Sequence, residues 1–421
     1  MFQGPISVSS AAKPAPVEDD LCIYRNDWLF SFLGQHADFF TVPKLLLLYV
    51  SVFIGVKVIL AYGTGVLWTH GWTTVAIADR YRYPLFSVLL RGFSKSGPSA
   101  PSPAAIPYLR DYSDILLMLF IAVQMVVIQR LWNDISIGPN RLYNDGIINI
   151  DYERYSQVVR RFDRWFNLRF WKILSLVLAI VLVAGAYYGL SASGMYKPLR
   201  AAGDLNWQHS AYDNWWANPA HHPLLFLYVF VVATFICYYT LRNNLAGLIA
   251  IFLCHTLFKC GTDRRGPMLS LDTSHPDGFG GIGILRNIVI KACFSVFNCL
   301  LCLFVIYCCF GWSSSIIPFY IAIMLLNPLF VLGPLFLIRR QVLQSKQYQI
   351  AECQKELQEF VRKGPADMAA LLHRIHLEQQ IAHLKAIPEL LFSPSGMLAF
   401  CITYYLPTYQ FIAWFINPSN G

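Results

Sequence analysis

The stretch ILSLVLAIVLVAGAYYGLSAS, residues 173–193, contains no charged side chain over its whole length. A helix needs about 20 mainly apolar residues to cross the roughly 30 Å hydrocarbon core of a bilayer. The stretch is long enough, and an uninterrupted apolar run of this length indicates a transmembrane helix. The sequence therefore predicts at least one membrane span here.

Similar apolar runs recur along the chain. Hydrophobic residues make up 56% of it and charged residues only 14%, whereas soluble domains carry about 25% charge. Six spans are predicted, at about 45–67, 115–131, 173–193, 223–241, 288–310 and 316–338. A further run at 396–416, interrupted by Pro407, leaves a seventh span open. The predicted fold class is an all-α membrane protein with six or seven transmembrane helices.

The regions outside the spans suggest four parts. Residues 1–44 form an N-terminal segment, in which residues 2–5 are typical of the remnant of a cleavable tag, and 45–340 form the transmembrane domain. Residues 341–390 are charged, with helical apolar stripes on either side of Gly364-Pro365, and predict a cytoplasmic helical hairpin. Residues 391–421 are a hydrophobic segment that either spans the membrane or packs in it. The apolar stretch 245–258 is too short for a separate span, and we expect it either to continue the fourth helix beyond the bilayer or to return along the membrane surface.

Basic residues in the loops predict the orientation. Lysine and arginine are frequent in 129–172 and 242–286, but only Lys197 and Arg200 occur in 194–222. Because basic loops stay on the inner side of a membrane, we expect a cytoplasmic N-terminus. The basic first loop does not fit this arrangement. The expected partners are the lipid bilayer and further copies of the chain, with four subunits as the working number.

Residues 151–171 combine an apolar stripe with many arginines. Tyr155, Val158, Phe162, Phe166 and Phe170 recur at helical spacing. One interpretation is an aromatic anchor in the membrane interface, with arginines near lipid phosphates. The other is a platform for a nucleotide or a short single strand, in which arginines bind phosphates and aromatic rings stack on bases. The arginines assigned to that ligand are Arg160, Arg161 and Arg164.

Residues 269–287, LSLDTSHPDGFGGIGILRN, contain four glycines just before the fifth span. Backbone amides at a helix N-terminus can bind an anion, and this hypothesis assigns the following residues to it: His275, Gly278, Gly280, Gly281, Arg264, Arg265 and Arg286. Alternatively, the small residues allow close helix packing or a hinge. A third interpretation is catalysis by Asp272, His275 and Asp277, although no nucleophile motif accompanies them.

Polar and helix-breaking residues inside the apolar runs are candidates for a pore or gate, because burying them in lipid is costly. They are Lys57, Gln124, Lys291, Asn298, Asn327, Pro328 and Gly333. No metal site or cofactor is predicted: His373, His376 and His383 fall roughly on one helical face, but no cysteine or carboxylate completes a set.

The run TSHPDGFGGIG, residues 273–283, resembles a T-H-P-D-x-x-G-G-L-G motif of bacterial multispan membrane proteins, with Ser274 inserted and Ile282 in place of leucine. The likeness covers this loop and its flanking spans, and it implies a location in a bacterial inner membrane. In architecture, the chain is similar to channel effectors of bacterial anti-phage defence, of the Hailong type, which a nucleotide signal controls; that likeness assigns no residues. Together these features predict an oligomeric ion channel gated by an anionic cytoplasmic ligand. The alternative is a membrane enzyme acting on a lipid or phosphate substrate.

Overall fold

The computed structural model describes residues 21, 27–36, 39–64, 67, 108–193, 215–220, 222–260, 269–273, 275–310, 317–363 and 368–387. Nearly all of these residues are helical. The helices are α1 (Trp28–Gln35), α2 (Val42–Val50), a π-helical turn (Ser51–Gly55), α3 (Val56–Gly63), a 3₁₀ turn (Tyr108–Arg110), α6 (Tyr112–Asn144), α7 (Tyr152–Phe166), α8 (Arg169–Ser193), α10 (Pro223–Cys260), α11 (Gly283–Phe310), α12 (Ile317–Lys363) and α13 (Met368–Ala386). The all-α fold class is confirmed for this part of the chain.

Five helical segments within the described ranges are long and apolar enough to cross a membrane: Val42–Gly63, Asp114–Asn144, Tyr152–Tyr188, Pro223–Leu257 and Gly283–Cys302. They match the first five predicted spans. The predicted sixth span, 316–338, falls on the first half of α12, where most side chains lie outside the description. Residues 396–416 lie outside the described residues altogether.

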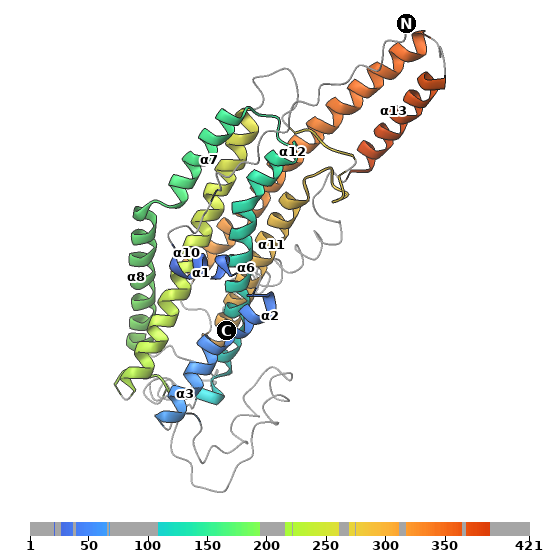
Figure 1. Cartoon of the computed structure of the whole chain (residues 1–421). Helices are drawn as coiled ribbons and strands as arrows, with labels where there is room; N and C mark the ends of the chain where they lie inside the picture. Colours follow the sequence, from blue (N-terminus) through green and yellow to red (C-terminus); the bar gives the residue numbers. More distant parts are fainter. Residues whose placement is uncertain are drawn as a thin grey trace.

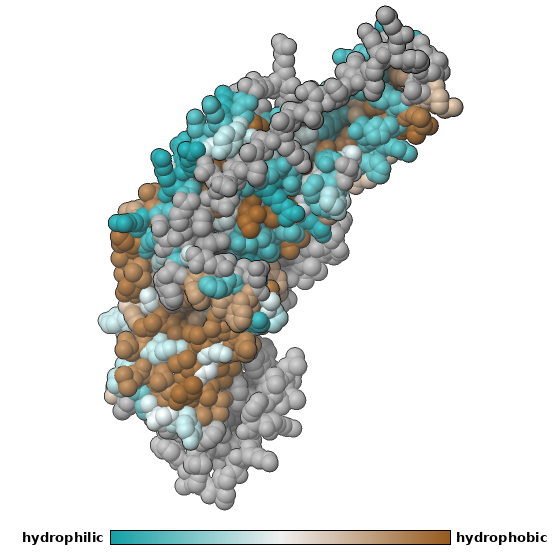
Figure 2. Space-filling model, viewed as in Figure 1, coloured by the Kyte–Doolittle hydropathy of each residue, from teal (hydrophilic) through white to brown (hydrophobic). Residues whose placement is uncertain are grey.

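The long helices reach well beyond the thickness of a bilayer. At 1.5 Å per residue, α10 with its 38 residues is about 57 Å long and α12 with 47 residues about 70 Å, against a hydrocarbon core of roughly 30 Å. Figure 2 shows brown, apolar side chains over the lower half of the molecule and teal, hydrophilic ones over the upper half. We call the upper part, formed by α7, α13 and the ends of the long helices, the helical extension (Figure 1). The prediction that residues 245–258 continue the fourth helix is confirmed.

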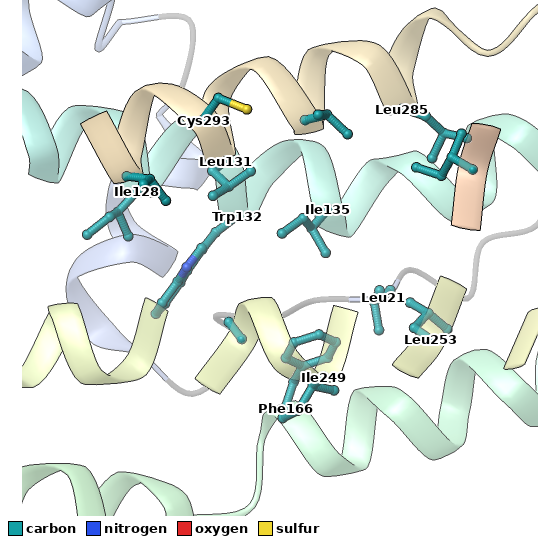
Figure 3. Packing of buried hydrophobic residues seen from close by; sticks show 14 of the residues in the cluster. Leu21, Ile128, Leu131, Trp132, Ile135, Phe166, Ile249, Leu253, Leu285 and Cys293 are labelled. Carbon is teal, nitrogen blue, oxygen red and sulfur yellow. The ribbon is translucent and has the colours of Figure 1, made fainter. Parts of the chain in front are cut away.

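Helix α6 lies at the centre of the structure and packs against α2, α10 and α11. Its side chain Trp132 is fully buried and contacts the ring of Phe30 edge-on at 5.0 Å. Figure 3 shows Ile128, Leu131 and Trp132 of this core between α10 and α11. By contrast, α8 packs mainly on α10 and leaves much of its apolar surface exposed, including Phe170, Ile173 and Val181. An apolar surface of this size is typical of a helix that faces lipid.

Helix α7 follows the predicted amphipathic pattern, but it is shorter than the 151–171 segment. Tyr155, Ser156, Val159, Phe162 and Phe166 are buried, and α7 packs against α10. The apolar stripe is therefore covered by protein, which leaves only the arginine-bearing face for other contacts. Phe170 is not part of the stripe, because it lies in α8 and is exposed.

Within the described residues, the second half of α12 packs against α13. The Lys346 ammonium donates hydrogen bonds to the carbonyl oxygens of Lys385 (2.9 Å) and Ile387 (3.0 Å). Further along, the rings of Phe360 and His373 lie 6.4 Å apart. From Lys346 to Phe360 the residue number on α12 rises, while that of the partner falls from 385 to 373. The two helices therefore run in opposite directions. Figure 1 shows this hairpin projecting from the end of the molecule.

Candidate functional site

The glycine-rich loop before α11 is built around backbone conformations that favour glycine. Gly278, Gly280 and Gly281 have φ angles of +67°, +68° and +89°. L-residues with a side chain adopt this region only at a cost in energy. Gly281 also lies close to Ile147, because a Cβ atom added to it would lie 2.2 Å from the Ile147 Cδ1 atom. Both backbone shape and space therefore require glycine at position 281.

The carboxylate of Asp277 binds three backbone amides of this loop, one of which, that of Gly281, belongs to a glycine that the sequence hypothesis assigned to an anion. Its Oδ1 accepts hydrogen bonds from the backbone N–H groups of Phe279 (2.8 Å) and Gly281 (3.0 Å), and its Oδ2 accepts one from Gly283 (2.8 Å). This is an anion bound in a glycine-rich turn, but the anion belongs to the chain itself. A free phosphate could use the same amides only by displacing Asp277.

These contacts also change the acidity of Asp277. Burial alone would raise its pKa, but the hydrogen bonds from Gly281, Phe279 and Gly283, together with His275, outweigh burial and hold the pKa below its ordinary value. The carboxylate is therefore charged at neutral pH and serves as the acceptor at the centre of the loop.

His275 links this loop to the end of α6. Its Nδ1 lies 3.0 Å from Asp277 Oδ1, and its Nε2 lies 3.7 Å from Oδ2 of Asp145, the residue that follows α6. Asp272 contributes a backbone N–H to the carbonyl oxygen of Gly280 (3.2 Å), while its side chain is exposed. Within the described ranges, no group of three or more histidine, cysteine, aspartate or glutamate side chains could hold a metal ion. The carboxylate of Asp277 is thus committed to structure, which leaves it poorly placed for acid–base chemistry.

The loop contacts elements on several sides. The Ser270 N–H donates to the carbonyl oxygen of Ile147 (2.8 Å), and Leu269 forms an isolated antiparallel bridge with Ile148, in the connection between α6 and α7. The α12–α13 hairpin reaches it through Gln349, whose Nε2 lies 3.5 Å from the carbonyl oxygen of Leu271.

Two further contacts complete this junction. Ile387, just after α13, packs against Gly280. A Cβ atom added to Gly280 would lie 3.0 Å from the Ile387 Cδ1 atom. On α11, the Arg286 guanidinium lies over the ring of Phe279, 4.3 Å from its centroid. The loop is therefore the junction between α6, α11 and the hairpin.

The predicted ligand-binding residues fall into separate groups. The loop holds His275, Gly278, Gly280 and Gly281, with Arg286 beside it in α11. A second group, Arg160, Arg161 and Arg164, is exposed on α7. Of these, Arg161 lies over the ring of Trp165, with 5.2 Å between the guanidinium carbon and the ring centroid. Arg264 and Arg265 lie outside the described residues.

The predicted pore residues of α6 and α11 are bonded to one another. The Gln124 Nε2 donates to the Ser295 Oγ (2.6 Å), and the Asn298 Nδ2 donates to the carbonyl oxygen of Phe120 (2.7 Å). The Asn298 amide also lies 3.2 Å from the Gln124 Oε1. These groups form a buried polar seam between two apolar helices. The side chains of Asn327, Pro328 and Gly333 in α12 lie outside the description.

Both predicted intramembrane lysines pair with aspartates of α6. The Lys57 Nζ lies 2.7 Å from both carboxylate oxygens of Asp114, and the Lys291 Nζ lies 2.5 Å from Asp134 Oδ2. Next to the first pair, Asp111 Oδ2 accepts hydrogen bonds from the indole N–H groups of Trp215 (3.1 Å) and Trp216 (2.8 Å). Sequence reasoning missed these aspartates. Their acidic side chains at the borders of an apolar run are the signal that could have identified them.

A comparison with protein-family models finds no matching family, and comparisons with curated proteins and with solved structures find no similar protein.

Proposed function

We propose that the chain is one subunit of an oligomeric ion channel, and that an anionic ligand bound to the helical extension controls its opening. The observation that carries this proposal is the position of the glycine loop, which contacts the α12–α13 hairpin on one side and the α6–α7 connection on another. A rearrangement of the extension would reach the membrane part through this loop.

The paired polar residues between α6 and α11 support the idea of a rigid moving unit. Amide and hydroxyl groups buried in an apolar environment are costly unless they are hydrogen-bonded. Gln124, Ser295 and Asn298 satisfy one another, and the Lys291–Asp134 ion pair adds a second link. Because separating the two helices would expose these groups to lipid, we expect α6 and α11 to move together. The ion path is therefore not assigned to the interface between α6 and α11. From the sequence alone, we assign it to Asn327, Pro328 and Gly333.

The arginine face of α7 is the proposed ligand site. Arg161 and Arg164 are exposed, and Trp165 beside them offers a ring on which a base could stack. The glycine loop is not assigned to this ligand, because Asp277 already accepts hydrogen bonds from the amides of Phe279, Gly281 and Gly283. The ligand class is a nucleotide or a short single-stranded oligonucleotide.

The proposed location is a bacterial inner membrane, with the N-terminus and the helical extension in the cytoplasm. Single cysteines at positions 160 and 365 should then react with a membrane-impermeant thiol reagent only from the inside, and a cysteine at 210 from the outside. Labelling of position 160 in intact cells would reverse this orientation. The role in anti-phage defence stays a prediction from resemblance.

Ion flux from liposomes tests the channel. Purified protein is reconstituted and flux is followed with and without ATP or a short oligonucleotide. We expect flux that changes with one of these ligands, and a smaller change in Arg161→Gln with Arg164→Gln. The matched control is Arg362→Gln, an exposed arginine on α12. Absence of flux under all these conditions would rule out the channel, and equal ligand responses in both variants would remove the site from α7.

The ionic strength of the assay gives a second test of the ligand site. Each phosphate contact contributes to the slope of log affinity against log salt concentration, about 0.7 per contact for single strands. Loss of two arginine contacts should flatten the slope by about twice that value. A slope unchanged in the double variant would mean that these arginines do not contact phosphate.

A further inference from the structure

Helix α13 is apolar on two opposite faces, but only one of them is covered within the structure. Leu377 and Leu384 are buried toward α12. On the other side, Met368 and Leu372 expose 71% and 61% of their surface, and Ile375 is exposed as well. A helix that is apolar on both faces is usually buried on both. The outward face therefore requires a partner.

The exposed residues on this face follow the spacing of a coiled coil. They are Met368, Leu372, Ile375, Gln379, Ala382 and Ala386, separated by alternate steps of four and three residues. This alternation is the heptad pattern, in which two positions of every seven form the contact with another helix. We call this set the outer seam. All six residues are exposed, and the seam extends over nearly the whole of α13.

We propose that the outer seam of α13 packs against the outer seam of a second copy of this chain, so that neighbouring subunits associate through their hairpins. The inference rests on the oligomeric state in the proposed function, and it adds which surface forms the contact. A heptad seam fits an identical helix well, because each side chain of one copy inserts between side chains of the other. In subunits that share one membrane and one symmetry axis along its normal, the two α13 helices run in the same direction.

The structure holds the seam in a position where it can make this contact. Lys346 binds the last carbonyl groups of α13, and Ile387 packs against the glycine loop, which fixes one end of the helix. Figure 2 shows brown side chains at the projecting end of the hairpin, far from the apolar band of the spans. The apolar face is therefore not explained by lipid contact.

One seam residue is polar, and its position gives the contact a defined register. Gln379 lies in the middle of the seam, between Ile375 and Ala382. In a parallel pair, the two Gln379 carboxamides would face each other and exchange hydrogen bonds. A single polar residue at such a position lowers the stability of a coiled coil but specifies its register and number of strands. Gln379→Leu should therefore strengthen association and broaden the distribution of oligomer sizes.

Disulfide cross-linking of the full chain in membranes tests the inference. Ala382→Cys lies in the seam, whereas the control Glu352→Cys is equally exposed but lies on α12. Under a mild oxidant, with the wild-type chain as the baseline for its natural cysteines, we expect several-fold more covalent dimer from Ala382→Cys than from Glu352→Cys. Equal yields from the two positions would overturn the inference.

A second set of variants separates loss of the seam from loss of the fold. Leu372→Glu with Ile375→Glu, in the Ala382→Cys background, should reduce the cross-link to the level of the control. Arg374→Ala, which is exposed but outside the seam, should leave it unchanged. A cross-link that survives the two glutamates would overturn the inference. Ion flux measured on the same samples tests the channel independently. A strong cross-link without flux supports the seam and contradicts the proposed function. Flux without the cross-link supports the channel and overturns the seam.

Discussion

Two lysine–aspartate pairs flank the apolar run 115–131 of α6, at what we call its two borders, and they use the same chemistry in different surroundings. At one border, Lys57 is fully buried against Asp114, and two tryptophan indoles bind the neighbouring Asp111. At the other, the Lys291 side chain is 34% exposed beside Asp134. Removing one partner of a buried ion pair leaves an uncompensated charge and is strongly destabilising, whereas removing one partner of an exposed pair costs little, because water hydrates the remaining charge. The first border is thus built as a fixed anchor, and the second, at the end of the run that leads toward the glycine loop, as the more adaptable end.

The largest expected effect tests the anchor. Lys57→Met leaves the Asp114 carboxylate buried without its cation, and breaking a buried pair costs about 3–5 kcal/mol. We expect a marked fall in the apparent melting temperature in detergent. Lys57→Met combined with Asp114→Leu should recover most of the loss, because no unpaired charge then remains. A single variant as stable as the wild type would show that the border is not an anchor.

Beyond the opposite border, in the glycine loop, Gly281→Ala combines two costs. A positive φ costs a residue with a side chain about 1–2 kcal/mol, and the clash with Ile147 adds about 1–3 kcal/mol of overpacking. Gly278→Ala is the matched control, because its φ is similar but nothing lies within 4 Å of the added Cβ. Melting temperatures of the two variants should therefore differ, with Gly281→Ala lower. Equal values would mean that Ile147 moves away without cost.

Asp277→Asn tests the carboxylate at the centre of the loop. The amide replaces one acceptor oxygen by a donor that faces backbone N–H groups, which should cost about 1–3 kcal/mol. Because the pKa of Asp277 is lowered in the folded state, its stabilisation is fully present above the unfolded pKa of about 3.9 and is lost as the pH falls through the lower folded value. The melting temperature of the wild type should thus fall more steeply below pH of about 4 than that of the variant. Parallel curves would contradict this role.

The smallest effect is expected for Lys291→Met. Its partner Asp134 can still be hydrated, so the loss should be about 1–2 kcal/mol, between the values for exposed and buried pairs. The comparison of the two borders depends on this difference. If Lys291→Met destabilises the protein as strongly as Lys57→Met, both borders are fixed anchors, and the proposed difference between them is wrong.

Features that depend on neighbouring residues were predictable, and pairings across the chain were not. Five spans followed from apolar run length, and three of the five predicted stripe residues of α7, Tyr155, Phe162 and Phe166, are indeed buried. Phe170 was misassigned because α7 ends before Asn167, whose side chain donates to the carbonyl oxygen of Asp163. That signal is local, since an asparagine side chain competes with the helix for nearby backbone groups.

The candidate site shows the same division. An aspartate followed by glycines is a turn pattern in which the side chain accepts nearby backbone N–H groups, so the binding of Asp277 to its own loop had a local signal. In contrast, Lys57 and Asp114 are 57 residues apart, and Gln124 and Asn298 are 174 apart. Nothing in the spacing of such residues specifies which helices become neighbours, so the sequence identified Lys57, Gln124 and Asn298 as polar candidates but did not identify their partners.

The geometry of Asp277 has a consequence for the chemical ageing of the protein. Aspartate followed by glycine is prone to cyclise: the glycine nitrogen attacks the carboxyl carbon, water leaves, and the succinimide reopens mainly to isoaspartate. Here both carboxylate oxygens are held by amides further along the chain, and the Gly278 N–H donates to the His275 carbonyl oxygen (3.3 Å). Both reacting groups are therefore kept in place. Peptide mapping after storage should find isoaspartate at position 277 forming much more slowly in the folded protein than in the unfolded chain.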